Sequence, residues 1–183
     1  MQRNFSHGRH TLVQVVHTLV QRYGVQGKLG SGKHSTVWLA KDNERDNTVA
    51  IKVFTAQPRY ESVALNELEW LKVLRSGNAN HNGHSHVSAI LDDFRIEGPT
   101  GSNLCLALEK MATNLSSLGR KFPPSQLSLL WAKEMAGQIL AGLDYIHSCG
   151  IICCGYLLSS LFWLIIDLQP ANILLNPPIT RKI

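Results

Sequence analysis

The chain has 183 residues, of which 44% are hydrophobic and 17% charged, and its 18 basic and 13 acidic side chains give a net charge of +5. A disordered chain needs less hydrophobicity and more charge, and a coiled coil needs far more Glu and Lys, so both are excluded in favour of a packed globular chain. The basic residues are scattered, so we expect no direct nucleic-acid partner.

The cysteines suggest a reducing compartment. They form no repeated C-x-x-C pair and have no histidines at zinc spacing, and they stand at positions 105, 149, 153 and 154. We therefore expect a cytoplasmic or nuclear protein, or both. Gln14 and His17 interrupt the apolar residues that follow the polar start, so a secretory signal is not expected. Residues 12–20 fit a helical stripe or a broken strand and stay unassigned.

The first half of the chain predicts a sheet. Strands are expected where β-forming residues alternate between turns, at 25–31, 36–41, 48–54, 86–96 and 103–109. In the third strand, alternation puts residues 49, 51 and 53 on one face and Ala50 with Lys52 on the other. Together with one helix, these strands make a five-stranded antiparallel sheet of the α+β class.

Two helices are predicted. Ser62 is expected to cap the first, which runs to about Arg75 and stops at Gly77. Ser125 is expected to cap a longer one that ends near Cys149 and Gly150. Its buried side is predicted to hold Leu127, Leu130, Trp131, Leu140, Leu143 and Ile146.

The turn Gly30-Ser31-Gly32 lets backbone N–H groups approach an anion closely, because glycine has no Cβ. Most such turns are only hairpins. Lys52, however, stands 20 residues after the second glycine in the context Val-Ala-Ile-Lys, which matches a phosphate-binding lysine. Glu67, on the predicted first helix, would neutralise it. Taken singly, Lys52 would be a solvated strand residue and Glu67 a surface charge.

Four motifs in this order resemble a eukaryotic protein kinase: residues 29–37, residues 49–52, Glu67, and Asp-Leu-Gln-Pro-Ala-Asn at 167–172. The amino-acid sequences of residues 35–42 and 167–174 are most similar to those of the serine/arginine-rich-protein kinases of a fungal-looking branch. The resemblance implies an N-terminal extension at 1–22, a kinase N-lobe at 23–110, and a hinge with an incomplete, helical start of the C-lobe at 111–183.

The resemblance also implies roles. ATP would lie under the 29–37 loop, with Lys52 on its α and β phosphates and paired with Glu67. Leu108 takes the gatekeeper position, and Asp167 would accept the proton of the substrate hydroxyl. The implied nucleotide contacts are Leu29, Gly30, Ser31, Gly32, Lys33, His34, Ser35, Thr36, Val37, Ala50, Lys52, Glu109 and Met111. Asn172 would bind Mg²⁺. The implied partners are ATP and Arg-Ser-rich protein substrates.

The chain departs from the family pattern in three places. Fourteen mostly apolar residues, 153–166, separate Gly150-Ile-Ile from Asp167, Gln169 replaces a lysine that steadies the transferred phosphate, and no Asp-Phe-Gly occurs before Ile183. We interpret 153–166 as a translated intron. A family-specific insertion is an alternative, and a membrane span is disfavoured because the apolar stretch is shorter than the roughly 20 residues needed. No membrane partner is expected.

Two functions stay open. The first is a serine/threonine kinase that transfers the γ-phosphoryl of Mg-ATP to Ser in Arg-Ser-rich proteins. The second is a catalytically dead fragment that binds ATP or a partner. The histidines at 81, 84 and 86 could suggest a metal cluster, but no Cys or carboxylate stands near them in sequence, and a polar loop is the better interpretation.

Overall fold

The computed structural model describes residues 22–98, 101–121, 128–152 and 169–175. They belong to two compact units. The first lies within residues 1–71 and 89–110, and the second within 72–88 and 111–183.

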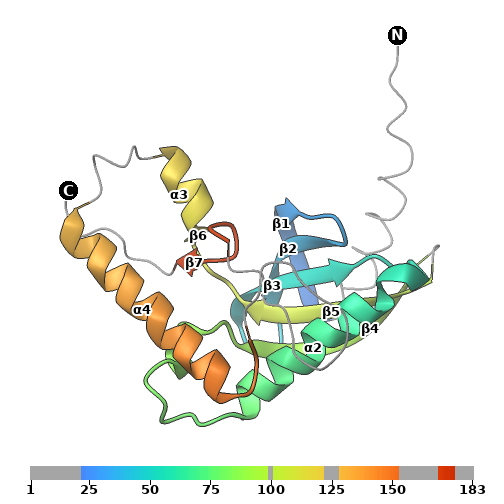
Figure 1. The fold of residues 1–183 in the computed structure, drawn as a ribbon. Helices are drawn as coiled ribbons and strands as arrows, with labels where there is room; N and C mark the ends of the chain where they lie inside the picture. The colour runs from blue at the N-terminus through green and yellow to red at the C-terminus, as the bar shows by residue number, and fades with distance from the viewer. Residues whose placement is uncertain (1–21, 99–100, 122–127, 153–168, 176–183) are drawn as a thin grey trace. The chain divides into compact units, whose positions relative to one another are not determined.

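The first unit is built on an antiparallel sheet with the strand order β1-β2-β3-β5-β4 (Figure 1). The strands are β1 (Tyr23–Ser31), β2 (Ser35–Asp42), β3 (Asn47–Phe54), β4 (Ile90–Gly98) and β5 (Gly101–Glu109). The predicted five-stranded antiparallel sheet is therefore confirmed. The predicted start of the fourth strand at His86 is wrong, because His84–His86 form a single 3-10 turn and pairing begins at Ile90.

Each face of the sheet has its own hydrophobic cluster. On one face, Val49, Ile51 and Val53 pack together with Cys105 and other buried residues. Burial raises the pKa of the Cys105 thiol to about 12, so this cysteine stays protonated. The alternation predicted for the third strand is confirmed, because the three β-branched residues share this face.

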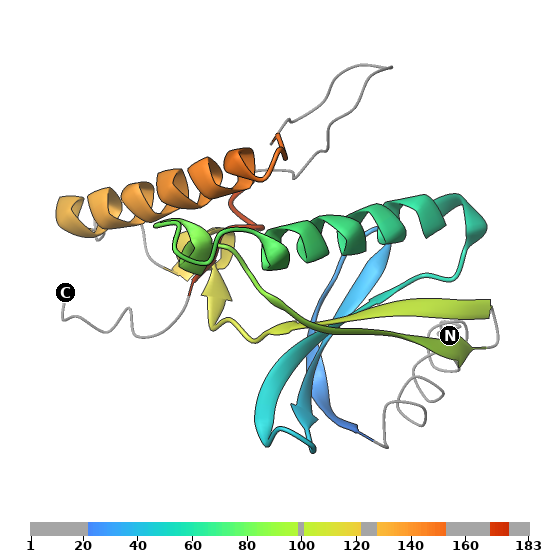
Figure 2. The ribbon, with the colours of Figure 1, turned by 90° about the horizontal axis from the view of Figure 1, so that it is seen from below.

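Helix α2 (Glu61–Ser76) covers the other face (Figure 2). Ala64 of α2 is buried in a cluster with Phe54, Ile90, Leu104 and Leu106 from three strands. A short 3-10 helix, η1 (Pro58–Tyr60), leads into α2. The predicted cap at Ser62 is wrong, because the helix already includes Glu61.

The second unit contains α3 (Leu115–Lys121), the short strands β6 (Thr113–Asn114) and β7 (Leu174–Leu175), and α4 (Leu129–Ser148). Helix α3 was not predicted from the sequence. Ser128 caps α4 by accepting a hydrogen bond from the Trp131 N–H at 3.1 Å, so the predicted cap at Ser125 is wrong. The predicted end near Cys149 and Gly150 is confirmed, and Gly150 has the left-handed φ of 77° that favours glycine there.

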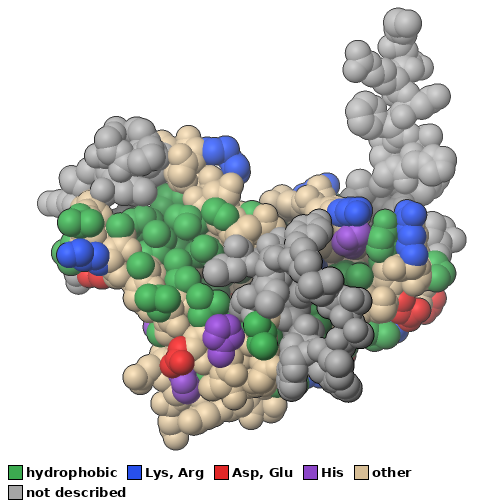
Figure 3. Space-filling model, in the orientation of Figure 1, with side chains coloured by type: hydrophobic (Ala, Val, Ile, Leu, Met, Phe, Trp, Pro, Cys, Tyr) green, Lys and Arg blue, Asp and Glu red, His purple; other side chains and the backbone are tan. Residues whose placement is uncertain are grey.

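The predicted buried side of α4 is only partly right. Of the predicted residues, Ile146 is buried and Trp131 and Leu143 are half-buried. Leu130 and Leu140, however, are 68% and 66% exposed. Figure 3 shows hydrophobic side chains gathered at the surface over α3 and α4. Leu127 lies outside the described residues. In the described ranges no helix is long and apolar enough to span a membrane, and the 153–166 segment is outside them.

Candidate active site

The glycine-containing turn joins β1 to β2. The two strands pair as far as Ser31 and Thr36, and the Gly32 N–H donates to the Ser35 carbonyl at 2.9 Å. A Cβ added at Gly30 or Gly32 would meet no atom within 4 Å. No internal contact therefore requires glycine at these two positions. What the glycines leave is open space beside the backbone, which an anion such as a phosphate can enter.

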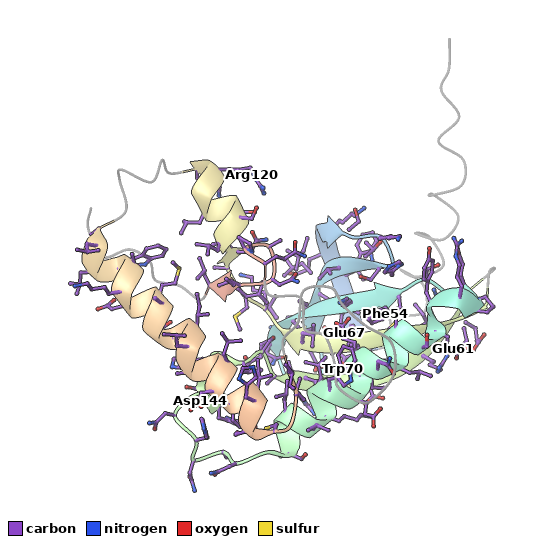
Figure 4. All side chains as sticks on the ribbon, in the orientation of Figure 1. Phe54, Glu61, Glu67, Trp70, Arg120 and Asp144 are labelled. Atoms are coloured by element: carbon purple, nitrogen blue, oxygen red, sulfur yellow. The ribbon has the colours of Figure 1, made fainter. Side chains whose placement is uncertain are left out.

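Lys52 and Glu67 form an ion pair, with Lys52 Nζ 2.5 Å from Glu67 Oε1. Lys52 lies on β3, opposite Val37 of β2 and Leu106 of β5, and Glu67 lies on α2. Figure 4 shows Glu67 where α2 crosses the strands. The two side chains are 22% and 28% exposed. The lysine is thus fixed in a half-buried place but stays accessible to a ligand from solvent.

The strand register brings the expected nucleotide contacts Ala50 and Glu109 close to the expected gatekeeper Leu108. Ala50 of β3 pairs with Leu108 of β5, and Glu109 follows, its N–H donating to the Ala89 carbonyl at 3.4 Å. Leu29 is 49% exposed and so has apolar surface free to pack on a ring. Met111 belongs to the second unit, and its contact with a nucleotide stays a prediction.

Within the second unit, backbone hydrogen bonds anchor the turn at residues 169–172. The Asn172 N–H donates to the Gln169 carbonyl at 2.8 Å, and the Pro170 carbonyl accepts from the Ser116 N–H at 3.0 Å. These bonds fix the turn that carries the expected Mg²⁺ ligand Asn172. Asp167, the expected catalytic aspartate, lies outside the described residues.

An ionic cluster at the start of β1 was missed in the sequence because Arg22 was assigned to an extension. Its guanidinium bonds Asp42 at 3.0 and 3.1 Å and Asp92 at 2.6 Å. The hydrogen bond from Arg22 holds the pKa of Asp42 below its usual range, and the side chain of Asp42 is only 2% exposed. Burial, helped by a hydrogen bond to Asp92, raises the pKa of Tyr23. The cluster therefore links the N-terminal end of β1 to Asp42 of β2 and Asp92 of β4.

The histidine loop packs on α4 and is not simply a polar connection. The ring centroids of His81 and His84 lie 5.3 and 5.2 Å from the ring centroid of Tyr145. His81 Nε2 is also 3.5 Å from Asp144 Oδ2. At Gly83 an added Cβ would come within 1.8 Å of the Ala141 carbonyl oxygen. The described residues contain no group of three or more His, Cys, Asp or Glu side chains that could hold a metal ion.

The sheet, the glycine turn and the ion pair between β3 and α2 define the small lobe of a protein kinase. A family model described as "Protein kinase domain" matches residues 23–183. The chain belongs to this family.

Its relatives include SRSF protein kinases. The chain is 35% identical over 156 residues to "Protein kinase dsk1" of Schizosaccharomyces pombe, a match that covers 85% of this chain and 26% of the relative. It is 34% identical to "Serine/threonine-protein kinase SKY1" of Saccharomyces cerevisiae, over 85% of this chain and 20% of the relative. For "SRSF protein kinase 3" of Homo sapiens the identity is 32%, over 94% of this chain and 29% of the relative. The chain therefore spans less than a third of the length of these relatives.

Proposed function

We propose that the chain binds ATP and serves as the nucleotide-binding part of a serine/threonine protein kinase. The observation that carries this is the ion pair of Lys52 and Glu67. A half-buried ammonium, held by a carboxylate on one side and accessible on the other, suits the α and β phosphates of a nucleotide. The open space beside the backbone at Gly30 and Gly32 leaves room for the phosphate oxygens.

Phosphoryl transfer would depend on the charge and the placement of the site residues. Phosphoryl transfer needs the phosphates held and their developing charge balanced, with little covalent chemistry from the protein. In this proposal Lys52 balances the charge, the glycine turn covers the phosphates, and Asp167 orients the substrate hydroxyl and accepts its proton. Mg²⁺, when bound through Asn172, would neutralise further phosphate charge.

We propose serines in Arg-Ser-rich proteins as the substrates. Two observations support this proposal. The chain is similar to the human "SRSF protein kinase 3", and residues 35–42 and 167–174 resemble the corresponding segments of serine/arginine-rich-protein kinases. The net charge of +5 gives no general attraction for such a basic peptide. Recognition would therefore depend on local acidic or hydrogen-bonding groups.

The second candidate is an ATP- or partner-binding kinase chain without transferase activity. Gln169 favours it, because a neutral amide there cannot balance the charge of the transferred phosphate. The fourteen residues 153–166, placed directly before Asp167, favour it too. Binding would survive in this case, since Lys52 and the glycine turn lie elsewhere in the sequence.

One pair of assays separates these functions. Binding of a fluorescent ATP analogue to the purified chain is expected to weaken at least tenfold in Lys52→Met, and to stay unchanged in Lys121→Met, which removes an exposed lysine on α3. Transfer of labelled phosphate from ATP to an Arg-Ser repeat peptide would establish the kinase. Binding without transfer would establish the second candidate, and equal binding by both variants would refute the proposed ATP site.

A further inference from the structure

The tip of the glycine turn is packed against the entry to α2. His34, at the tip, has its ring centroid 4.1 Å from that of Tyr60, with the two planes tilted by 45°. Tyr60 is the last residue of η1, directly before the first residue of α2. The guanidinium of Arg59 also lies on the Tyr60 ring, 4.6 Å from its centroid. The turn between β1 and β2 is thus held by an aromatic contact.

Backbone bonds support the same arrangement. The Thr55 N–H, just after β3, donates to the His34 carbonyl at 2.9 Å, and the Gly32 N–H donates to the Ser35 carbonyl at the same distance. The turn is therefore fixed at both its main chain and its tip. Because η1 continues into α2, the contact also links the turn to the helix that carries Glu67.

The imidazole of His34 contacts Tyr60 through its ring. His34 Nδ1 is buried and has no hydrogen-bond partner among the described residues. A buried polar atom without a partner opposes folding, so the polarity of the side chain does not explain its place here. Packing of the ring on Tyr60 does explain it.

We propose that His34 and Tyr60 form a latch that holds the glycine turn in place before a nucleotide binds. The latch rests on the proposed ATP site and extends it to a positioning residue, Tyr60, that would not itself touch the nucleotide. A loop that is already ordered loses less conformational freedom on binding, so affinity for the phosphate-bearing ligand rises. An aromatic contact of this kind corresponds to roughly a three- to tenfold change in an equilibrium constant.

The first test compares two ligands on the full chain. Tyr60→Ala is expected to weaken ATP binding about three- to tenfold. Adenosine, which has no phosphates for the turn to cover, is expected to bind as it does to the wild type. Tyr60→Phe should keep wild-type ATP affinity, because it keeps the ring. Equal weakening for ATP and adenosine would show a general structural defect and overturn the latch.

Two variants of His34 decide what the imidazole does. His34→Phe keeps the ring and removes the unpaired nitrogen, so its free energy of unfolding in urea should equal or exceed that of the wild type. His34→Ala should match Tyr60→Ala, and the double alanine variant should be no weaker than either single one, because both remove the same contact. Loss of stability in His34→Phe, or additive losses of ATP affinity in the double alanine variant, would refute the latch.

A third measurement needs no nucleotide. Hydrogen exchange at the Thr55 amide, which bonds the His34 carbonyl, should be about three- to tenfold faster in Tyr60→Ala than in the wild type. Unchanged exchange would overturn the latch. If exchange accelerates but the wild type binds no ATP, the latch stands and the proposed ATP site fails, so the two failures are distinguishable.

Discussion

The ion pair between Lys52 and Glu67 makes a quantitative prediction for Glu67→Gln. Exposed ion pairs contribute about 0.2–1 kcal/mol, and hydrogen bonds to charged groups contribute about 1.5–3 kcal/mol when sheltered from water. With side chains 22% and 28% exposed, this pair lies between the two cases. We expect Glu67→Gln to lower the free energy of unfolding by about 1 kcal/mol.

The assay is urea unfolding of the full chain, followed by circular dichroism. With a slope of about 2 kcal/mol per molar urea, a loss of about 1 kcal/mol moves the midpoint down by roughly 0.5 M. Glu69→Gln, a change of the same chemistry at an exposed position of the same helix, should move it by less than about 0.2 M.

A double-mutant cycle tests the cause. In a Lys52→Met background, Glu67→Gln should cost almost nothing, because its partner is already absent. A high salt concentration should reduce the wild-type coupling only in part, since the pair is half-buried. Equal losses in the wild-type and Lys52→Met backgrounds would refute the claim that the two side chains stabilise one another.

Three further predictions concern the Arg22 cluster and the loop that carries Gly83. Arg22→Gln should lower the free energy of unfolding by about 2 kcal/mol in the same urea assay, because the enclosed carboxylate of Asp42 loses both guanidinium hydrogen bonds; a loss below about 0.5 kcal/mol would contradict this. The lowered pKa of Asp42 means that its stabilising effect is complete above its unfolded pKa of about 3.9 and is lost as the pH falls through the lower folded value. Between pH 6 and pH 3 the wild type should therefore lose more stability than Asp42→Asn, and parallel losses would count against the ionic cluster. Gly83→Ala should cost about 3 kcal/mol in thermal unfolding, because its Cβ would collide with the Ala141 carbonyl, and an unchanged midpoint would show that the loop does not pack on α4 as described.

The strands of the first unit were predictable because their signals are local. Alternation along residues 49–53 places one set of side chains on each face, and the same period of two places Lys52 beneath α2. The kinase motifs were also visible as residue types at fixed spacing. Element ends were less predictable, since a cap depends on one hydrogen bond: Ser128 makes it in α4, and the sequence offered Ser125 equally well.

The sequence by itself determined the fold class and the kinase family. The fold class follows from periodicity, and the family follows from short motifs whose residues are neighbours in the chain. Only the tertiary structure decided the contacts between residues far apart. The Tyr60 ring on His34, the Arg22 cluster with Asp92, and the close approach of Gly83 to α4 are examples. No sequence period encodes such contacts, because they depend on how whole elements pack.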